Sequence, residues 1–577
     1  MPARRLLVGT AVLCSVTLLA FAYGCHDNAR LTDPTLQADI RITATGLIKL
    51  AYSCGNYFRV RNLNPTAVSA AYTVSGSPTQ WPLELPAPAV GKPYSETFFL
   101  TPIKGTVSLF YQDTLVTSVP NASKGCATTF TKGSWSPVSP WPLVAIHATL
   151  LPDGNVLAFQ RDSAMLDPML WNPTTGFFTT VPSGVNLFCS GHAFLPDGRL
   201  LVAGGHASAD HGIRNAMLFD YVTQTWTPAP PMLAGRWYPT NTTLADGEVL
   251  TIAGGDENAA TNLIPEVYDQ SGNWRELTDA SKGLAYYPRM FLAPDGRVFH
   301  AGPEQNTSFL DPSGTGSWTP GPVSSFPSRA YGSAVMYEPG KILIVGGGAP
   351  QPTATAEVID LNGSATWRSV ASMPTARRQH TATMLPDGMV LVTGGTKGKG
   401  FNNAVGAQKP ALIWNPATER WTVMASASVN RLYHSTALLL PDGRVLSAGG
   451  GQAPAIGEVD QYNGQLFSPS YLFNPTGGPS ERPIISSAPT STAYGATFQV
   501  DSPNASEVVS VTLVRLGSVT HAFDQNQRFM RLAFTRDTGF ITVTAPTLPT
   551  DAPPGHYMLF LVNMNGVPSV ASILQVL

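Results

Sequence analysis

A pattern of the form LPDGxxLxxGG returns about every 45 to 50 residues between residues 150 and 455 of this 577-residue chain. Its Pro-Asp-Gly core is a turn signal, and the alternating residues after it are typical of a strand. A tandem repeat of this length predicts one four-stranded sheet per copy, arranged radially as a β-propeller. The seven copies, some of them degenerate, begin at Leu151, Leu195, Leu244, Ala293, Tyr337, Leu385 and Leu440.

The rest of the chain predicts two further β units, so the expected fold class is all-β. The propeller, of kelch type because of its Gly-Gly pairs and later Trp residues, is assigned to residues 135–480. Residues 41–130 alternate like a small β-sandwich whose role as spacer, carbohydrate-binding module or docking domain is open. Residues 26–40 are assigned to a linker, and residues 484–577 predict a second sandwich of immunoglobulin-like size.

Each propeller copy ends in a second hairpin, for example FDYVTQTWTP or IWNPATERWTV. An Asn, Asp or Gly turn between β-rich flanks is the hairpin signal. We interpret the Trp residues of these hairpins as structural groups that pack between blades: Trp226, Trp274, Trp318, Trp367 and Trp421.

The first 25 residues have the form of a secretory signal peptide. Arg4 and Arg5 precede an apolar run from Leu6 to Ala22, which is short for a membrane span. We therefore expect an exported protein, whether secreted, periplasmic or at the cell surface. The small residues before Cys25 are similar to a lipoprotein cleavage box, which leaves open whether lipidated Cys25 attaches the protein to a membrane.

Export changes how the five cysteines are interpreted. Cys14 leaves with the signal, and Cys54 and Cys126 bracket the first sandwich as the pair for a disulfide. Cys189 is then left alone inside the propeller, either as a buried small hydrophobe or as a reactive group. The net charge of −2 gives no electrostatic reason to expect nucleic acid as a partner.

The repeat also supplies a register on which unusual residues align. The register is the position eight residues before the Asp of each Pro-Asp-Gly, which falls at the start of the first strand, near the propeller axis. Because side chains alternate along a strand, residues at this position should face the same way in every blade. Tyr and His side chains around a central hole suit a transition metal such as Cu(II), although polar residues lining a wet channel are the plainer interpretation. The residues at this register are Ala145, Cys189, Tyr238, Tyr287, Tyr331, Gln379 and His434, and Tyr433 stands beside the last.

Several of these segments resemble the glyoxal oxidase and galactose oxidase family, and the resemblance covers about residues 135–577. Its most specific motifs are RLYHS followed by LLPDGRV from Arg431, and THAFDQNQR from Thr520. FCSGHAFLPDGRLLVAGG from Phe188 and GRWYPTNTTLADG from Gly235 also match, and the RWY triplet favours the glyoxal oxidase branch. The family comprises mononuclear copper radical oxidases.

The resemblance implies a role for each of five residues. Tyr238 is similar to the radical tyrosine, an equatorial copper ligand, and Cys189 to the cysteine joined to its ring through a thioether. Tyr433 is similar to the axial tyrosinate that acts as general base. His434 and His521 are similar to the two imidazole ligands, His521 reaching the hole from the C-terminal sandwich. The implied cofactors are one copper ion and a self-derived Tyr238–Cys189 thioether radical.

The implied reaction is a two-electron oxidation of a small aldehyde, a primary alcohol or a terminal carbohydrate group. Tyr433 accepts the hydroxyl proton, the radical removes a hydrogen atom from carbon, and O2 is reduced to H2O2. We expect a monomer. Two other classes stay open: a non-enzymatic kelch propeller for carbohydrate binding or adhesion, and a hydrolase or lyase, for which the ring offers no paired carboxylates.

One position departs from galactose oxidase. Asp256 stands where that enzyme has a Trp stacked over the thioether, and a carboxylate would not shield a radical as an indole does. Trp237, next to Tyr238, is the candidate substitute, and a substrate other than galactose is expected. Arg329 is either a substrate-orienting residue at the mouth or a surface Arg. His147, His192 and His380 lie near the ring register and are left out of the ligand set.

Overall fold

A computed structural model describes residues 48–88, 94–122, 124–161, 167–457 and 460–577. The expected signal peptide and linker therefore lie outside the described residues. The described chain is almost entirely β, as expected, and its one α-helix, α1 (Thr128–Lys132), has five residues. Within the part of the chain that the structure describes, no helix has the length and apolar character needed to cross a membrane.

Seven antiparallel sheets form the propeller in the described residues, which confirms the seven-bladed prediction. In each sheet, the Pro-Asp-Gly turn, or the degenerate turn that replaces it, joins the innermost strand to the second strand. Blades 1 to 3 are β10 (His147–Leu150), β11 (Val156–Phe159), β12 (Met169–Trp171) and β13 (Phe178–Thr180); β14 (Gly191–Phe194), β15 (Leu200–Ala203), β18 (Ala216–Asp220) and β19 (Thr225–Ala229); and β20 (Thr240–Thr243), β21 (Val249–Ile252), β22 (Glu266–Tyr268) and β23 (Trp274–Glu276).

Blades 4 to 6 follow the same order, and blade 4 carries the longest outer strand. They are β24 (Met290–Leu292), β25 (Val298–His300), β26 (Glu304–Asp311) and β27 (Ser317–Ser328); β28 (Ser333–Glu338), β29 (Lys341–Val345), β30 (Ala356–Asp360) and β31 (Arg368–Val370); and β32 (Arg378–Met384), β33 (Val390–Thr396), β34 (Pro410–Asn415) and β35 (Arg420–Ser426).

Blade 7 closes the ring with strands from both ends of the repeat region. Its first three strands are β36 (Ser435–Leu439), β37 (Val445–Gly449) and β38 (Asn463–Ser468), and the fourth is β8 (Ser134–Trp135), from before the first repeat. The short strand β9 (Ser139–Pro140) also pairs with β38. Because blade 7 contains strands from both ends of the repeat region, it joins the first and last parts of the propeller and closes the ring.

The outer-strand Trp residues fasten neighbouring blades to one another. The indole N–H of Trp226 donates to the carbonyl of Val181 at 3.0 Å, at the end of the preceding blade. The same contact recurs from Trp274 to Pro230, Trp318 to Ala280, Trp421 to Ala371 and, at the closing strand, Trp135 to Ala425. Trp367 is also buried, but its indole nitrogen has no hydrogen-bond partner. The inter-blade interpretation of these residues is thereby confirmed.

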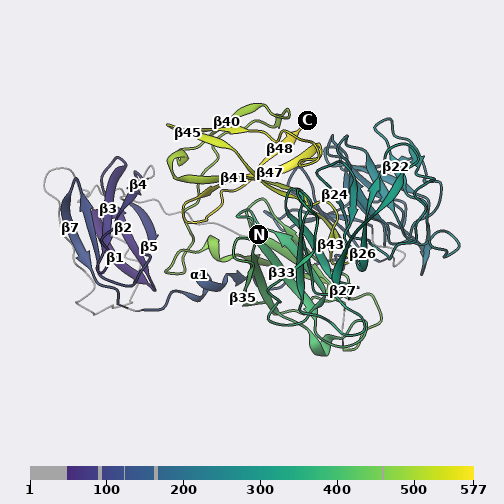
Figure 1. Cartoon of the computed structure of the whole chain (residues 1–577), viewed down its shortest axis with the longest axis horizontal. Helices are drawn as coiled ribbons and strands as arrows, with labels where there is room; N and C mark the ends of the chain where they lie inside the picture. The colour runs from purple at the N-terminus through teal and green to yellow at the C-terminus, as the bar shows by residue number, and fades with distance from the viewer. Residues whose placement is uncertain (1–47, 89–93, 123, 162–166, 458–459) are drawn as a thin grey trace, which may run out of the picture.

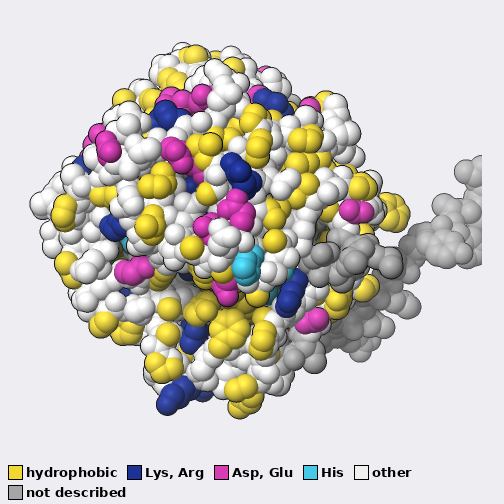
Figure 2. Space-filling view, turned by 90° about the vertical axis from the view of Figure 1, so that its right-hand side faces the viewer, with side chains coloured by type: hydrophobic (Ala, Val, Ile, Leu, Met, Phe, Trp, Pro, Cys, Tyr) yellow, Lys and Arg dark blue, Asp and Glu magenta, His cyan; other side chains and the backbone are white. Residues whose placement is uncertain are grey.

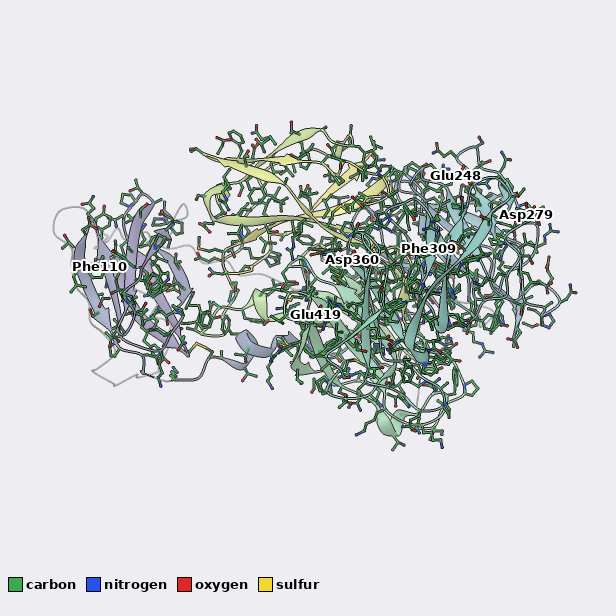
Figure 3. All side chains as sticks on the ribbon, viewed as in Figure 1. Phe110, Glu248, Asp279, Phe309, Asp360 and Glu419 are labelled. Carbon is green, nitrogen blue, oxygen red and sulfur yellow. A yellow bond between two sulfur atoms is a disulfide. The ribbon has the colours of Figure 1, made fainter. Side chains whose placement is uncertain are left out.

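The N-terminal sandwich stands to one side of the propeller and is joined to it through α1 (Figure 1). One sheet holds β1 (Ile48–Cys54), β2 (Tyr57–Asn62) and β5 (Ser95–Leu100). The other holds β4 (Gln80–Leu85), β3 (Val68–Val74), β6 (Val107–Tyr111) and β7 (Thr114–Val119). The predicted disulfide between Cys54 and Cys126 is present and is drawn as the yellow bond in Figure 3. It ties the first strand of the sandwich to the segment that enters α1.

The C-terminal sandwich sends one hairpin away from its own sheets. The sheets are β39 (Ser491–Thr492), β48 (Ser572–Val576), β47 (Gly555–Asn563), β41 (Val508–Arg515) and β44 (Phe529–Leu532), facing β40 (Thr497–Asp501), β46 (Phe540–Thr544) and β45 (Phe534–Asp537). The hairpin of β42 (Ser518–Thr520) and β43 (Phe523–Asp524) instead pairs with β10 of blade 1, and β43 lies among the propeller strands in Figure 1.

The molecular surface carries few charges, since only 12% of the residues are Asp, Glu, Lys or Arg. On the face shown in Figure 2, acidic and basic side chains are scattered singly or in small groups among hydrophobic and uncharged ones.

The Trp contacts give a prediction with an internal control. Trp226→Phe keeps an aromatic ring but leaves the Val181 carbonyl without its donor, so the free energy of unfolding should fall by about 1–2 kcal/mol. Trp367→Phe removes an indole N–H that makes no bond and should change the unfolding free energy by much less. Chemical denaturation of both variants tests the comparison, and equal losses would contradict it.

Candidate metal centre

The ring register defined by the repeat has one backbone conformation in six of its seven positions. Each of these residues has a positive φ, in the left-handed region that non-glycine residues seldom adopt. The values are 65° for Cys189, 69° for Tyr238, 47° for Tyr287, 58° for Tyr331, 61° for Gln379 and 69° for His434. Such conformations cost energy and gather at functional sites, so the shared geometry marks the axial end of the blades.

Backbone hydrogen bonds join neighbouring members of this ring. The amide of Tyr238 donates to the carbonyl of Cys189 at 2.8 Å, and the amide of Tyr287 donates to the carbonyl of Tyr238 at 3.0 Å. Across blades 5 and 6, the amide of Gln379 donates to the carbonyl of Tyr331 at 2.7 Å. These bonds fix the spacing between side chains that come from different blades.

The turn of the β42–β43 hairpin brings His521 to the same place. Thr520 pairs with His147 of β10, so the hairpin extends blade 1 toward the axis. His521 follows at once and, like the ring residues, has a positive φ, of 48°. The structure thus shows how a residue of the C-terminal sandwich reaches the centre of the propeller.

The polar segment after His521 anchors the hairpin. The Asp524 carboxylate accepts backbone N–H groups from Ser518, Asn526 and Gln527 at 2.9–3.0 Å, which holds the hairpin in shape. The Gln525 side-chain oxygen then accepts the amides of His192 in blade 2 and Asn241 in blade 3. Gln527 bonds to Met384 and Ala382 in blade 6, and Arg528 to Leu292 in blade 4. We name residues 518–528 the plug.

Four side chains with nitrogen or oxygen donors meet in one cluster, and one of them, His521, belongs to the plug. The hydroxyls of Tyr238 and Tyr433 are 2.8 Å apart. The rings of His434 and His521 lie 4.6 Å apart, centre to centre, and are nearly perpendicular. The His521 ring lies 4.5 Å from that of Tyr238 and 5.3 Å from that of Tyr433. All four side chains are at most 8% exposed.

Hydrogen bonds fix which imidazole nitrogen is free in both histidines. Nδ1 of His434 donates to the carbonyl of Gly451 at 2.7 Å, which leaves Nε2 with a lone pair. The Thr520 hydroxyl donates to the carbonyl of Ile146 and therefore accepts from Nδ1 of His521 at 2.6 Å. Both Nε2 atoms are buried and have no hydrogen-bond partner. A buried imidazole oriented in this way through its other nitrogen is typical of a metal ligand.

Burial keeps the two histidines and the two tyrosines uncharged when no ion is bound. Burial lowers the pKa of His434 to about 3 and that of His521 well below its ordinary value, and it raises the pKa of Tyr238 and Tyr433 well above the ordinary range for tyrosine. The histidines are therefore neutral and ready to donate lone pairs. A bound dication would offset the cost of ionising the phenols.

The donor set fits copper. Two imidazoles and two phenols match the nitrogen and oxygen ligands of a tetragonal Cu(II) site. In the described ranges, no three His, Cys, Asp or Glu side chains converge as a metal-binding group, so this cluster depends on its tyrosines. The two unpartnered Nε2 atoms and the paired phenols are the observations that point to a metal ion here.

Cys189 lies in the same cluster as Tyr238. The two residues belong to one buried group with Phe188 and Tyr287, and the thiol is free and fully buried. Burial raises the pKa of the Cys189 thiol, and the neighbouring Tyr238 hydroxyl acts in the opposite direction. The thiol therefore stands protonated beside the phenol, as a small buried group without a disulfide partner.

Asp256, the position expected to depart from galactose oxidase, lies at the start of an exposed turn. Its carboxylate accepts the amides of Asn258 and Ala260, so it shapes its own turn. The ring of Trp237 takes the place over Tyr238, with the ring centres 3.8 Å apart and the planes 10° from parallel. The adjacent Trp therefore covers the phenol face.

The remaining histidines near the register have other partners. Nδ1 of His147 and Nε2 of His192 are 3.0 Å apart, and Nε2 of His147 accepts the amide of Cys189 at 3.1 Å. This pair therefore supports the backbone of Cys189, and the His147 ring meets that of His521 edge-on, with 5.8 Å between ring centres. His380 is buried in β32 of blade 6, and it also lies outside the donor cluster.

Arg329 does not reach the mouth, and the expectation that it orients substrate or lies on the surface is wrong. Its side chain is 5% exposed and pairs with Glu357 at 2.6 Å. It also donates to the carbonyls of Gly346 and Thr355. Arg236 makes the equivalent contacts in blade 3, with Glu266 and two carbonyls, so this Arg is a structural element of the repeat.

Sequence reasoning missed the plug side chains and the neighbour of Trp237. The run Asp-Gln-Asn-Gln-Arg gave a signal, because so many polar residues in sequence need internal partners when they are buried. His206, which accepts the indole N–H of Trp237 at 2.9 Å, gave none, since the two residues lie on different blades.

Comparisons with known proteins place the chain in one family. Residues 159–467 match the family model "Glyoxal oxidase N-terminus", and residues 482–576 match "Galactose oxidase-like, Early set domain". Galactose oxidase of Gibberella zeae is 30% identical over 488 residues, which cover 77% of this chain and 70% of that protein. The aldehyde oxidase GLOX of Vitis pseudoreticulata is 30% identical over 67% of this chain and 81% of its own length.

A solved structure is similar over the same region. It is a fungal alcohol oxidase of the AA5 family in complex with copper, 28% identical, with a TM-score of 0.71. The match covers 77% of this chain and 99% of that one.

The plug generates a stability prediction. Gln525→Ala leaves two buried amides, in blades 2 and 3, without an acceptor, so the free energy of unfolding should fall by roughly 2–4 kcal/mol. Gln499→Ala, on an exposed position of β40 in the same sandwich, should change it by less than about 0.5 kcal/mol. Thermal or chemical unfolding measures both losses. Equal losses of stability in Gln525→Ala and Gln499→Ala would show that the plug does not anchor the C-terminal sandwich to the propeller.

Proposed function

Starting from the fact that this chain belongs to the glyoxal oxidase and galactose oxidase family and is a copper radical oxidase, we propose that it oxidises a small aldehyde or a primary alcohol. The second product is H2O2, formed from O2. For an alcohol the balance is R–CH2OH + O2 → R–CHO + H2O2, a transfer of two electrons and two protons. The convergence of two unpartnered imidazole nitrogens with two phenols is the observation that carries this proposal.

In this proposal Tyr238, Tyr433, His434 and His521 hold the copper ion. When bound, the ion supplies a Lewis-acidic position for the substrate oxygen and stores one electron. His434 and His521 are each fixed in orientation by a hydrogen bond at Nδ1, so the site is rigid before the metal arrives.

Two tyrosines divide the work on the substrate. Tyr433 accepts at its phenolic oxygen the hydroxyl proton of an alcohol, or of the hydrate that an aldehyde forms with water, a general-base role. Tyr238, joined to Cys189 through a thioether and oxidised by one electron to its radical, removes a hydrogen atom from the substrate carbon and becomes a phenol again. The 2.8 Å contact between the two hydroxyls supports the proposal that both groups act on one small substrate. The buried surroundings exclude water from the reacting atoms.

The thioether would form from the protein's own residues. A bond forms between the sulfur of Cys189 and a ring carbon of Tyr238, while one S–H and one C–H bond break. The two electrons and two protons reduce O2 to H2O2. Free Cys189, buried in one cluster with Tyr238, supports this assignment.

The relatives support an aldehyde or alcohol as the substrate class, since they include a galactose oxidase, an aldehyde oxidase and an alcohol oxidase. We propose a substrate other than galactose, because Trp237 and Asp256 depart from galactose oxidase. A terminal carbohydrate group is the alternative within the same chemistry. We further propose a monomer.

We also propose that the protein acts outside the cytoplasm. The Cys54–Cys126 disulfide supports this location, because structural disulfides persist in oxidising compartments. The sequence of residues 1–25 supports export by a signal peptide. Attachment through lipidated Cys25 can be tested by metabolic lipid labelling of the wild type and Cys25→Ala.

Mass spectrometry tests the proposed thioether. After copper loading in air, the wild type should lose two hydrogen atoms beyond those lost in the disulfide, and one peptide should link Cys189 to Tyr238. Cys189→Ala removes the sulfur and should show neither change. Copper-loaded wild type that keeps a free Cys189 thiol would refute the thioether.

Peroxide formation tests the role of Tyr433. Tyr433→Phe removes the proposed base and should lower kcat for aldehydes and alcohols by about 100-fold or more. Tyr221→Phe, a half-buried tyrosine beside His556 and remote from the cluster, serves as the matched control and should keep full activity. Peroxide is measured with a coupled peroxidase. If both variants oxidised substrate at the wild-type rate, Tyr433 would not be the base.

A further inference from the structure

Trp237 covers one face of the Tyr238 ring, and its indole also lies beside the Cys189 thiol. Its backbone exchanges two hydrogen bonds with Gly255, at 2.8 and 2.9 Å. The ring of Tyr286 meets the indole edge-on, with 5.1 Å between ring centres. The indole N–H donates to Nδ1 of His206 at 2.9 Å.

We propose that His206 is a positioning residue that holds the Trp237 indole flat against the radical ring of Tyr238. It thereby sets the potential of the Tyr238 radical and the rate at which the thioether to Cys189 forms. This inference rests on the proposed function, since it concerns the radical that the function requires.

The bond to His206 is the contact with defined hydrogen-bond geometry at the indole N–H, and it restricts the rotation of the indole beside the Cys189 thiol. The bonds to Gly255 hold only the backbone of Trp237 and leave its side-chain torsions free. An edge contact with Tyr286 limits movement on one side. The indole N–H is a donor with a single direction, so its bond to Nδ1 selects the plane in which the ring lies. That plane is the one found 10° from parallel to the Tyr238 ring.

His206 comes from a different blade and is itself held in place. It begins β16 (His206–Ser208), which pairs with β17 (His211–Gly212) in a hairpin between the second and third strands of blade 2. Its amide donates to the carbonyl of Asn186, and its ring lies 5.2 Å from that of Phe188. The imidazole therefore presents Nδ1 from blade 2 to the indole of blade 3.

A stacked indole affects an oxidised phenol in two ways. Its electron-rich face lies against the ring that loses an electron, and this attraction favours the oxidised form. It also covers part of a side chain that is 8% exposed, and so keeps water from the radical. Both effects weaken when the indole turns away from the parallel arrangement.

The test compares three variants in the full-length, copper-loaded protein. His206→Leu removes the acceptor at similar size, and His206→Gln restores an acceptor through its amide oxygen. His211→Leu is the matched control, because His211 lies in the same hairpin and its Nδ1 contacts the Glu257 carbonyl, away from Trp237. The radical midpoint potential is titrated by visible absorbance, and thioether formation is timed by mass spectrometry.

We expect His206→Leu to make the radical at least tenfold harder to form, which is about 59 mV for a one-electron couple. Thioether formation should slow by a similar factor. His206→Gln should stay within about threefold of the wild type, and His211→Leu should match it. The inference is overturned if His206→Leu has the potential and the rate of the wild type. Should His206→Leu not fold, His206→Ala carries the same expectation.

A measurement on the metal-free protein separates this inference from the proposed function. The indole N–H resonance of Trp237, assigned with Trp237→Phe, should shift upfield in His206→Leu and hold its position in His206→Gln. An unchanged resonance overturns the His206 contact itself. A wild type that forms the contact but no radical and no thioether would instead refute the proposed function.

Discussion

The docking of residues 518–528 into the propeller is the interaction on which the rest of this molecule depends. A propeller alone brings three of the four proposed ligands together, and His521 arrives only because β42 pairs with β10 of blade 1. A polar hairpin can enter a protein interior only if its groups find partners there. Asp524, Gln525 and Gln527 meet that need by bonding to the plug itself and to amides of blades 2, 3 and 6. The same bonds that hold the plug therefore also fix the position of His521, the proposed metal ligand.

The axial ring adds a second constraint, which is carried by the backbone. Cys189, Tyr238 and His434 all adopt left-handed conformations that a free chain would avoid. Hydrogen bonds between successive blades keep them there, because Tyr238 bonds to the carbonyl of Cys189 and Tyr287 to that of Tyr238. The propeller thus holds these residues in a strained backbone conformation, and their side chains project from it toward the axis. A rigid scaffold of this kind suits a site whose ligands come from distant parts of the sequence.

Much of the architecture was predictable from the sequence, because a repeat places equivalent residues at equivalent sites. The seven blades, the inter-blade Trp residues and the Cys54–Cys126 disulfide follow from spacing and composition. The ring register identified equivalent positions in successive blades for the same reason, and the structure brings its Cys, Tyr and His members together. Arg329 could not be placed, since its partner Glu357 lies on another strand and only the fold brings them together. The His206–Trp237 contact joins two blades and left no local pattern in either segment.

Electron paramagnetic resonance of the Cu(II) protein tests the central claim, that the plug completes the copper site with His521. Nitrogen hyperfine splitting should show two imidazole nitrogens in the wild type and one in His521→Gln. The control His556→Gln changes a histidine of the same sandwich that lies against Tyr221, remote from the site, and should leave the spectrum unchanged. A His521→Gln spectrum identical to that of the wild type would show that His521 is not a ligand and would contradict this account.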